Sequence, residues 1–256
     1  LRRADTAMYR AKERGRDRFE VFDEEFERDL VERIETRNDL RFALERGEFE
    51  VFFQPEVDLE TGDLVGVEAL VRWHHPIRGT LNASKFIEVA EETGAILDLD
   101  AWTMQRACEH MVEWQRLFPE RPSLILKVNL SAHQLAQKEL VPMVRRILEI
   151  TGLSPGLLCL EITETALMSD PEACLGVLKG LRGLGVQLAV DDFGTGYSSL
   201  SYLKRFPVHI LKVDRSFVMG LPHDSDDVAI VRTIVQLADI MGLKLTAEGI
   251  EDPKQI

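Results

Sequence analysis

The sequence predicts an α/β protein in which strands and helices alternate around a TIM-like (β/α) barrel. Two observations carry this prediction: short, almost continuously apolar runs, and a polar residue directly after each run. The runs lie at residues 64–67, 124–128, 157–160, 186–190, 210–213 and 243–247. Such runs are typical of parallel strands that helices cover on the outer face.

The spacing of the polar residues favours a barrel over other α/β folds. Asn129, Glu161 and Asp191 follow one another at intervals of about 30 residues, the length of one strand–helix unit. A longer interval after Glu68 indicates an insertion of one further unit. An open, doubly wound sheet would show the same alternation, but it would not bring so many strand ends to one point. In a barrel all of these ends meet at one mouth.

Residues 23–47 form a charged stretch that predicts a helical linker ahead of the barrel. It carries a narrow apolar stripe and stops at a glycine. The stripe consists of Phe26, Leu30, Ile34, Leu40 and Leu44. A narrow stripe fits a solvated helix that lies on the following domain, and it also fits a stalk that pairs two copies of the chain. We therefore expect residues 48–256 to form the barrel.

Composition narrows the classes of function. The chain of 256 residues is 45% hydrophobic and 29% charged, with a net charge of −13, which is typical of a globular protein and speaks against a nucleic acid polymer as partner. Its apolar runs are too short for a membrane segment. The three cysteines lack metal-site spacing and indicate reduced thiols. We expect a cytoplasmic location for this portion, although the full protein could be tethered to a membrane.

The polar residues at the strand ends suggest a metal site. They supply five carboxylates and one amide oxygen, from Glu68, Asn129, Glu161, Asp191, Asp192 and Glu248. These are hard oxygen donors, which suit Mg²⁺ or Mn²⁺ better than zinc. Carboxylates crowded at one mouth repel each other unless cations neutralise them. Two divalent cations would do so, and paired metals support in-line displacement at phosphorus.

Lys212 lies within an apolar strand, where an ammonium is costly unless carboxylates or phosphate surround it. Asp214 lies on the same side of that strand, which favours a catalytic role for Lys212. A lysine that extends outward to solvent is the usual alternative, and we assign it to Lys127 and Lys244. His74 and His75 are expected in an ordinary loop, after a tryptophan that packs in the core.

Seven segments resemble the EAL-domain cyclic di-GMP phosphodiesterases, in the same order and at matching spacing. They are Gln54-Pro55, Val67 to Trp73 with Glu68-Ala69-Leu70, Val128 to Ser131, Glu161 to Glu164, Asp191 to Leu200, and Leu211 to Phe217, with Ala247-Glu248-Gly249 following. The resemblance runs from about residue 40 to the end. It implies hydrolysis of cyclic di-GMP to linear pGpG with two divalent cations, Mg²⁺ or Mn²⁺.

The resemblance also implies roles for individual residues. Glu68, Asn129, Glu161 and Asp191 would hold one metal, and Asp191, Asp192 and Glu248 the second. Lys212 and Glu68 would act in catalysis with Glu164, which would steady the loop after Asp192. Gln54, Leu70 and Arg72 would contact the substrate. A receptor of the same fold that binds cyclic di-GMP without cleaving it is the alternative, although no ligand is missing as far as Glu248.

Both ends of the chain carry further expectations. Residues 1–22 resemble the last helix and strand of a GGDEF domain, which implies an upstream GGDEF or sensory domain in the full protein. The resemblance to the EAL family, together with the helix predicted after residue 22, implies a homodimer. Family barrels continue beyond Glu248 with another helix and an eighth strand. We therefore expect residues 48–256 to form a barrel without its last strand and helix, and residues 1–256 alone to have weak activity or none.

Overall fold

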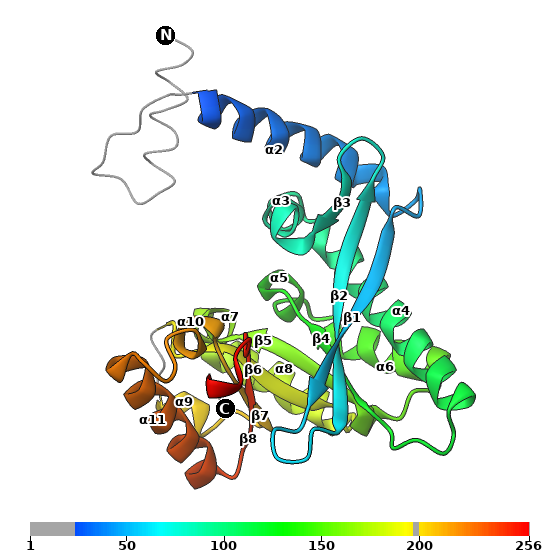
Figure 1. The fold of residues 1–256 in the computed structure, drawn as a ribbon. Coiled ribbons are helices and arrows are strands. Elements are labelled where there is room, and N and C mark those ends of the chain that lie inside the picture. The colour runs from blue at the N-terminus through cyan, green and yellow to red at the C-terminus, as the bar shows by residue number, and fades with distance from the viewer. Residues whose placement is uncertain (1–23, 197–199, 256) are drawn as a thin grey trace.

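The computed structural model describes residues 24–196 and 200–255 and shows a curled sheet with helices around it (Figure 1). Along the sheet the strand order is β1-β2-β4-β5-β6-β7-β8, and β3 pairs with β2 outside this path. The strands are β1 (Phe49–Val57), β2 (Leu64–His75), β3 (Gly79–Asn82), β4 (Ile125–Asn129), β5 (Leu158–Thr163), β6 (Gln187–Phe193), β7 (Ile210–Val213) and β8 (Lys244–Ala247).

The six predicted apolar runs all form strands, and from β2 to β8 along the sheet path these strands are parallel to one another. The TIM-like barrel prediction is therefore confirmed. The antiparallel first strand, β1, which pairs with β2, was not predicted. Over the described residues the sheet order begins at β1 and ends at β8, so the sheet is a curled half-barrel.

The described residues contain ten α-helices. They are α2 (Glu24–Ala43), α3 (Ile87–Thr93), α4 (Ile96–Leu117), α5 (Ala132–Leu135), α6 (Leu140–Thr151), α7 (Glu164–Ser169), α8 (Pro171–Gly183), α9 (Leu200–Leu203), α10 (Arg215–Val218) and α11 (Ser225–Met241), with short 3₁₀ turns at Ala83–Lys85, Pro155–Leu157 and Pro253–Gln255. The main core lies between the strands and α4, α6, α8 and α11. No described helix is long and apolar enough to cross a membrane.

Local sequence sets the helix boundaries. The Asp170 carboxylate accepts a hydrogen bond from the Ala173 backbone N–H at 3.2 Å, and Pro171 occupies the first helical position of α8. Gly152 and Gly242 end α6 and α11 in the left-handed conformation that glycine adopts at low cost.

The insertion after Glu68 forms a small lobe beside the barrel. β2 continues past the barrel wall, pairs with β3 and leads into α3 (Figure 1). Trp73 is fully buried there and packs against Phe49 and Phe86, so its prediction as a packing residue is confirmed. The prediction of a loop at His74 and His75 is wrong, because both residues belong to β2.

The helix α2 lies on this lobe through its C-terminal half. Leu40 and Ala43 are buried in the lobe core. His75 is also buried, and its Nε2 lies 3.1 Å from Asp39 Oδ2 of α2. The predicted stripe is not buried throughout, because Ile34 is 53% exposed. Residues 1–22, with their resemblance to a GGDEF terminus, lie outside the described residues.

The loop that follows β4 is held by α4. Asp100 Oδ2 accepts hydrogen bonds from the Ser131 backbone N–H at 3.1 Å and from the Ser131 hydroxyl at 2.6 Å. Ser131 in turn caps α5 by accepting from the Gln134 backbone N–H. Burial raises the pKa of Asp100 to about 6, although both Ser131 hydrogen bonds act to lower it. Asp100 thus fixes the chain two residues beyond the strand-end residue Asn129.

Removing the Leu40 side chain tests how α2 is attached. Leu40→Ala should lower the free energy of unfolding by about 2–5 kcal/mol, because it leaves a cavity in the lobe core. Ile34→Ala on the same helix is the control and should cost less than about 1 kcal/mol, since this side chain is largely exposed. Urea unfolding of both variants measures the difference. Equal losses would mean that α2 does not depend on the lobe.

Asp100 should make stability depend on pH. Its pKa is higher in the folded state than in the unfolded chain, so the folded protein binds this proton more tightly. The stabilisation is complete below about pH 4 and is lost as pH rises through about 6, with a magnitude of roughly 2–3 kcal/mol. Asp100→Asn should therefore become more stable relative to the native protein between pH 4 and 7. Asp98→Asn, an exposed position of the same helix, should show no such trend.

Candidate metal and catalytic site

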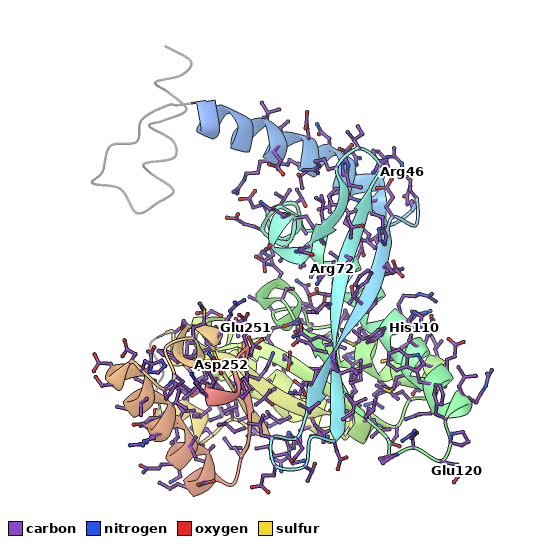
Figure 2. All side chains as sticks on the ribbon, viewed as in Figure 1. Arg46, Arg72, His110, Glu120, Glu251 and Asp252 are labelled. Carbon is purple, nitrogen blue, oxygen red and sulfur yellow. The ribbon has the colours of Figure 1, made fainter. Side chains whose placement is uncertain are left out.

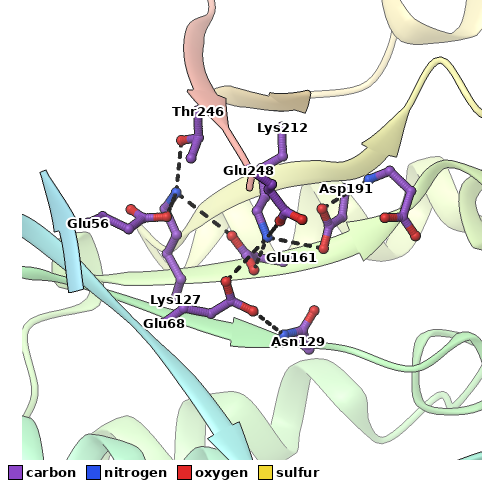
Figure 3. A network of polar contacts seen from close by, with 10 residues as sticks. Glu56, Glu68, Lys127, Asn129, Glu161, Asp191, Lys212, Thr246 and Glu248 are labelled. Carbon is purple, nitrogen blue, oxygen red and sulfur yellow. Dashed lines mark hydrogen bonds and ion pairs between the residues drawn. The ribbon is translucent and has the colours of Figure 1, made fainter. Parts of the chain in front are cut away.

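The polar residues predicted at the strand ends converge inside the curled sheet (Figure 3). They come from five strands and from the residue that follows β8, because parallel strands deliver their carboxyl ends to the same side. The prediction that Glu68 ends its strand is wrong, because β2 continues to His75. Glu68 lies on β2, Asn129 on β4, Glu161 on β5, Asp191 and Asp192 on β6, Lys212 on β7, and Glu248 directly after β8. All seven therefore belong to one polar network or its immediate border.

Lys212 is at the centre of this network. Its Nζ lies 2.7 Å from Glu161 Oε2 and 3.1 Å from Asp191 Oδ2. It is also 2.7 Å from Glu248 Oε1 and 3.5 Å from Glu68 Oε2. The side chain is 1% exposed. Lys212 therefore points into the sheet and not to solvent, and four carboxylates from four different strands or strand ends surround its ammonium group.

The charges of the network are strongly coupled. Burial alone would lower the pKa of Lys212, but the surrounding carboxylates, Glu161 foremost, outweigh it and raise this pKa above its ordinary value. Burial raises the pKa of Glu161 to about 8 against the opposing effect of Lys212. It also raises the pKa values of Glu248 and Asp192. One ammonium thus does not neutralise all of these carboxylates, and the site favours additional positive charge.

The two adjacent aspartates reach the site because β6 is irregular. Successive residues of a regular strand face opposite sides of the sheet. The pairing of β6 with β7 shifts register between Val190 and Phe193, and Asp192 has a positive φ of 53°. The Asp191 carboxylate accepts a hydrogen bond from the Asp192 backbone N–H at 2.9 Å. This irregularity keeps both carboxylates near the network, as bulges beside active sites commonly do.

Asn129 and Glu68 form a direct pair at the border of the network. The Asn129 side-chain amide donates to Glu68 Oε1 at 2.8 Å. Asn129 lies opposite Glu161 in the register of β4 and β5. Its amide oxygen is therefore held at the level of the carboxylates, next to the mouth of the sheet.

Glu164 lies apart from the network, beneath the loop that follows β6. It is 1% exposed, and its Oε2 accepts a hydrogen bond from the Gly194 backbone N–H at 2.9 Å. Gly196 passes so close to it that a Cβ there would be 3.0 Å from Glu164 Oε1. Glu164 is thus placed to hold residues 192–196, while residues 197–199 of the predicted loop lie outside the described part.

The three residues expected to contact substrate lie along the ribbon formed by β1 and β2. Glu68, Leu70 and Arg72 alternate on β2 and therefore share one face. Gln54 on β1 lies directly opposite Glu68. The Arg72 guanidinium lies over the Phe52 ring, 5.6 Å from its centroid, on the part of the ribbon that extends toward the lobe (Figure 2). Gln54, Leu70 and Arg72 thus lie in a row along the ribbon, which begins beside Glu68 and extends away from the carboxylates.

A second level of polar contacts, nearer the amino ends of the strands, was not predicted. Lys127 is 2% exposed, so its prediction as an outward-pointing lysine is wrong. Its Nζ lies 2.5 Å from Glu56 Oε1 of β1 and 2.9 Å from Thr246 Oγ1 of β8. Lys244 is exposed, as expected. A strand covered on both faces gives no sequence signal for the direction of one lysine, so Lys127 could not be assigned from its strand alone.

The residues present fit divalent cations. Glu56, Glu68 and Glu161 offer carboxylate oxygens that lie within 4.8 Å of one another. Among buried side-chain atoms, Glu161 Oε1 has no hydrogen-bond partner. All donors that converge here are hard oxygens, which bind Mg²⁺ and Mn²⁺ in preference to softer metals. The three cysteines, Cys108, Cys159 and Cys174, are free, buried thiols elsewhere in the core.

Comparison with known proteins identifies relatives over almost the whole chain. The chain is 44% identical over 252 residues to the bifunctional diguanylate cyclase/cyclic di-GMP phosphodiesterase MucR of Pseudomonas aeruginosa, covering 98% of this chain and 36% of that protein. It is 40% identical over 256 residues to the cyclic di-GMP phosphodiesterase NbdA of the same organism, covering 100% of this chain and 32% of that protein. The chain thus spans about a third of the length of these relatives.

Solved structures agree in fold. A structure described as the PaMucR phosphodiesterase in complex with c-di-GMP superposes with a TM-score of 0.82 at 45% identity, covering 86% of this chain and 89% of that chain. The EAL enzyme Bd1971, bound to cAMP and cyclic di-GMP, superposes with a TM-score of 0.82 at 31% identity, covering 88% and 61%. Residues 37–256 match the EAL domain family, and the chain belongs to this family.

Proposed function

We propose that this chain is a metal-dependent phosphodiesterase that hydrolyses cyclic di-GMP to linear pGpG. The observation that carries this proposal is the buried ammonium of Lys212 among Glu68, Glu161, Asp191 and Glu248, at the carboxyl ends of the strands. A relative of 45% identity over most of the chain has been described as a phosphodiesterase in complex with c-di-GMP. The geometry of the site and the similarity to this phosphodiesterase thus support the same reaction.

Two divalent cations, Mg²⁺ or Mn²⁺, are proposed for this site. Glu68, Asn129, Glu161 and Asp191 would hold one of them, and Asp191, Asp192 and Glu248 the other. When bound, such ions lower the pKa of a coordinated water and offset charge on the phosphate. The raised pKa values of Glu161, Glu248 and Asp192 support this assignment, because a carboxylate that favours a proton in the absence of metal also gains from a nearby cation.

The protein's own groups bind and orient the reactants. Lys212 stays charged among its carboxylates and can donate a hydrogen bond to the attacking water or to a phosphate oxygen. Its four carboxylate partners fix the position of Nζ, so that little reorganisation is needed during the reaction. In the reaction, water forms a new bond to phosphorus while one ester oxygen leaves as the ribose hydroxyl. One of the two phosphodiesters is opened and the other is retained.

Gln54, Leu70 and Arg72 are proposed to bind the nucleotide. They lie on the β1–β2 ribbon beside Glu68, and Arg72 supplies a cation for a phosphate group. Glu164 acts through the loop that it holds, and is therefore a positioning residue. The resemblance of residues 1–22 to a GGDEF terminus supports an upstream GGDEF domain, and the apolar stripe on residues 23–47 supports a homodimer.

Turnover of cyclic di-GMP tests the proposal directly. The full-length protein with Mg²⁺ or Mn²⁺ should yield pGpG, and a chelator should abolish the product. Glu68→Gln should reduce kcat by at least about 100-fold, because it removes one carboxylate from the proposed first metal. Chromatography of the products measures both effects.

A matched control separates the site from general effects of charge. Glu120→Gln removes a carboxylate from an exposed position far from the network (Figure 2) and should leave turnover unchanged. If the protein binds cyclic di-GMP but gives no product with either metal, it is a receptor and not an enzyme. If Glu68→Gln keeps activity within a fewfold of the native protein, the assignment of Glu68 to the metal is wrong.

The Glu164 contact generates a separate prediction. Glu164→Ala should increase hydrogen exchange at the Gly194 amide, because that amide loses its acceptor. Activity should fall by at least about tenfold, since Asp192 begins the same loop. Glu172→Ala, at an exposed position of α8, is the control. Unchanged exchange at Gly194 in Glu164→Ala would show that the loop is held by other contacts.

A further inference from the structure

A second buried ammonium, that of Lys127, belongs to the level of polar contacts nearer the amino ends of the strands. Neither the proposed mechanism nor the proposed ligand set uses it. Lys127 extends from β4 into the interior of the sheet, and its side chain is 3% exposed. Its Nζ contacts Glu56 Oε1 at 2.5 Å and Thr246 Oγ1 at 2.9 Å, and lies 3.8 Å from Glu161 Oε1 (Figure 3). The contacts of Lys127 therefore reach β1, β5 and β8, the first and last of which form the two ends of the sheet.

The carboxylates around Lys127 have the geometry of a cation site. Glu56, Glu68 and Glu161 each offer an oxygen, and these oxygens lie within 4.8 Å of one another. Glu161 contributes to two levels, because its Oε2 contacts Lys212 while its Oε1 faces Lys127. Oε1 is buried and has no hydrogen-bond partner, so the positive charge of Lys127 is what it faces. Without this lysine, three carboxylates would share the space with Lys212 alone.

The backbone makes room for Glu56 in this arrangement. Gly66 lies opposite Glu56 in the register of β1 and β2. A Cβ at Gly66 would be 3.2 Å from Glu56 Oε2 and 2.9 Å from the Ile125 carbonyl oxygen. A side chain at this position would therefore push against both the Glu56 carboxylate and β4. The glycine allows the carboxylate to lie inside the sheet, within reach of Lys127.

We propose that the Lys127 ammonium takes the place of a bound cation beside Glu56 and Glu161, in the lower level of carboxylates nearer the amino ends of the strands. Lys127 thereby confines divalent ions to the upper level, the carboxylates at the carboxyl ends of the strands. A tethered ammonium has fixed charge and position, and it neutralises Glu56 without the exchange that a bound ion undergoes. Lys127 also faces Glu161 Oε1, while Glu161 Oε2 contacts Lys212 on the side of the strand ends. Lys127 is thus a positioning residue that decides where metal can bind. The proposal rests on the proposed metal dependence.

Counting bound Mn²⁺ in the absence of substrate tests this role. The native protein and its variants are dialysed against Mn²⁺, and bound ions are counted by electron paramagnetic resonance and elemental analysis. Lys127→Ala should bind one more Mn²⁺ per chain than the native protein, because removal of the ammonium opens a site formed by Glu56, Glu68 and Glu161. Lys127→Ala/Glu56→Gln should return to the native number. Lys127→Arg keeps the charge and should also retain the native number.

The outcomes separate this proposal from the proposed function. A folded Lys127→Ala variant that binds the native number of ions would overturn the role of Lys127, whatever the native protein binds. A native protein that binds no Mn²⁺ at all would instead refute the metal dependence. If Lys127→Ala unfolds without metal, Mn²⁺ should restore its melting transition. Failure of both Lys127→Ala and Lys127→Ser to fold at any Mn²⁺ concentration would reduce Lys127 to a structural residue and overturn the proposal.

Discussion

The ion pairs of Lys212 are the interaction on which the site depends. The fold brings four carboxylates from four strands or strand ends to one place, and like charges at such distances repel strongly in a poorly solvated interior. The ammonium at their centre offsets part of this repulsion and fixes the relative positions of Glu161, Asp191 and Glu248. It cannot offset all of it, since several carboxylates still have raised pKa values. The site is therefore ordered, but its negative charge is not fully neutralised. Divalent cations bind well to such a site.

The sequence predicts the upper level of the site because barrel architecture links position to function. A polar residue that ends an apolar strand must lie at the mouth, so the spacing of Asn129, Glu161 and Asp191 along the chain is enough to place them together. The irregular register at Asp191 and Asp192, in contrast, could not be predicted from the sequence. It depends on how β6 pairs with β7 and on one positive φ, and neither is encoded in the apolar pattern of β6 alone.

Two of the features that were missed depend on partners distant in sequence. Lys127 points inward because Glu56 on β1 and Thr246 on β8 receive it, and these residues lie 71 and 119 positions away. His75 is buried because Asp39 of α2 accepts its contact over 36 positions. The strand around Lys127 was predicted correctly, and only the direction of the side chain was wrong. That direction is decided by tertiary contacts, which override local preference.

The two lysines divide the interior of the sheet into two levels of charge. Lys212 contacts Glu161 through one oxygen and Lys127 faces the other, so that a single glutamate is held between two fixed cations. If the Glu161 carboxylate turned out of this position, it would lose both contacts. The lower level is closed by Glu56 and Thr246, whereas the upper level borders Asn129 and the exposed mouth. The same electrostatic requirement is thus met by a fixed side chain below and left open above, where we propose that exchangeable ions and the phosphate substrate bind.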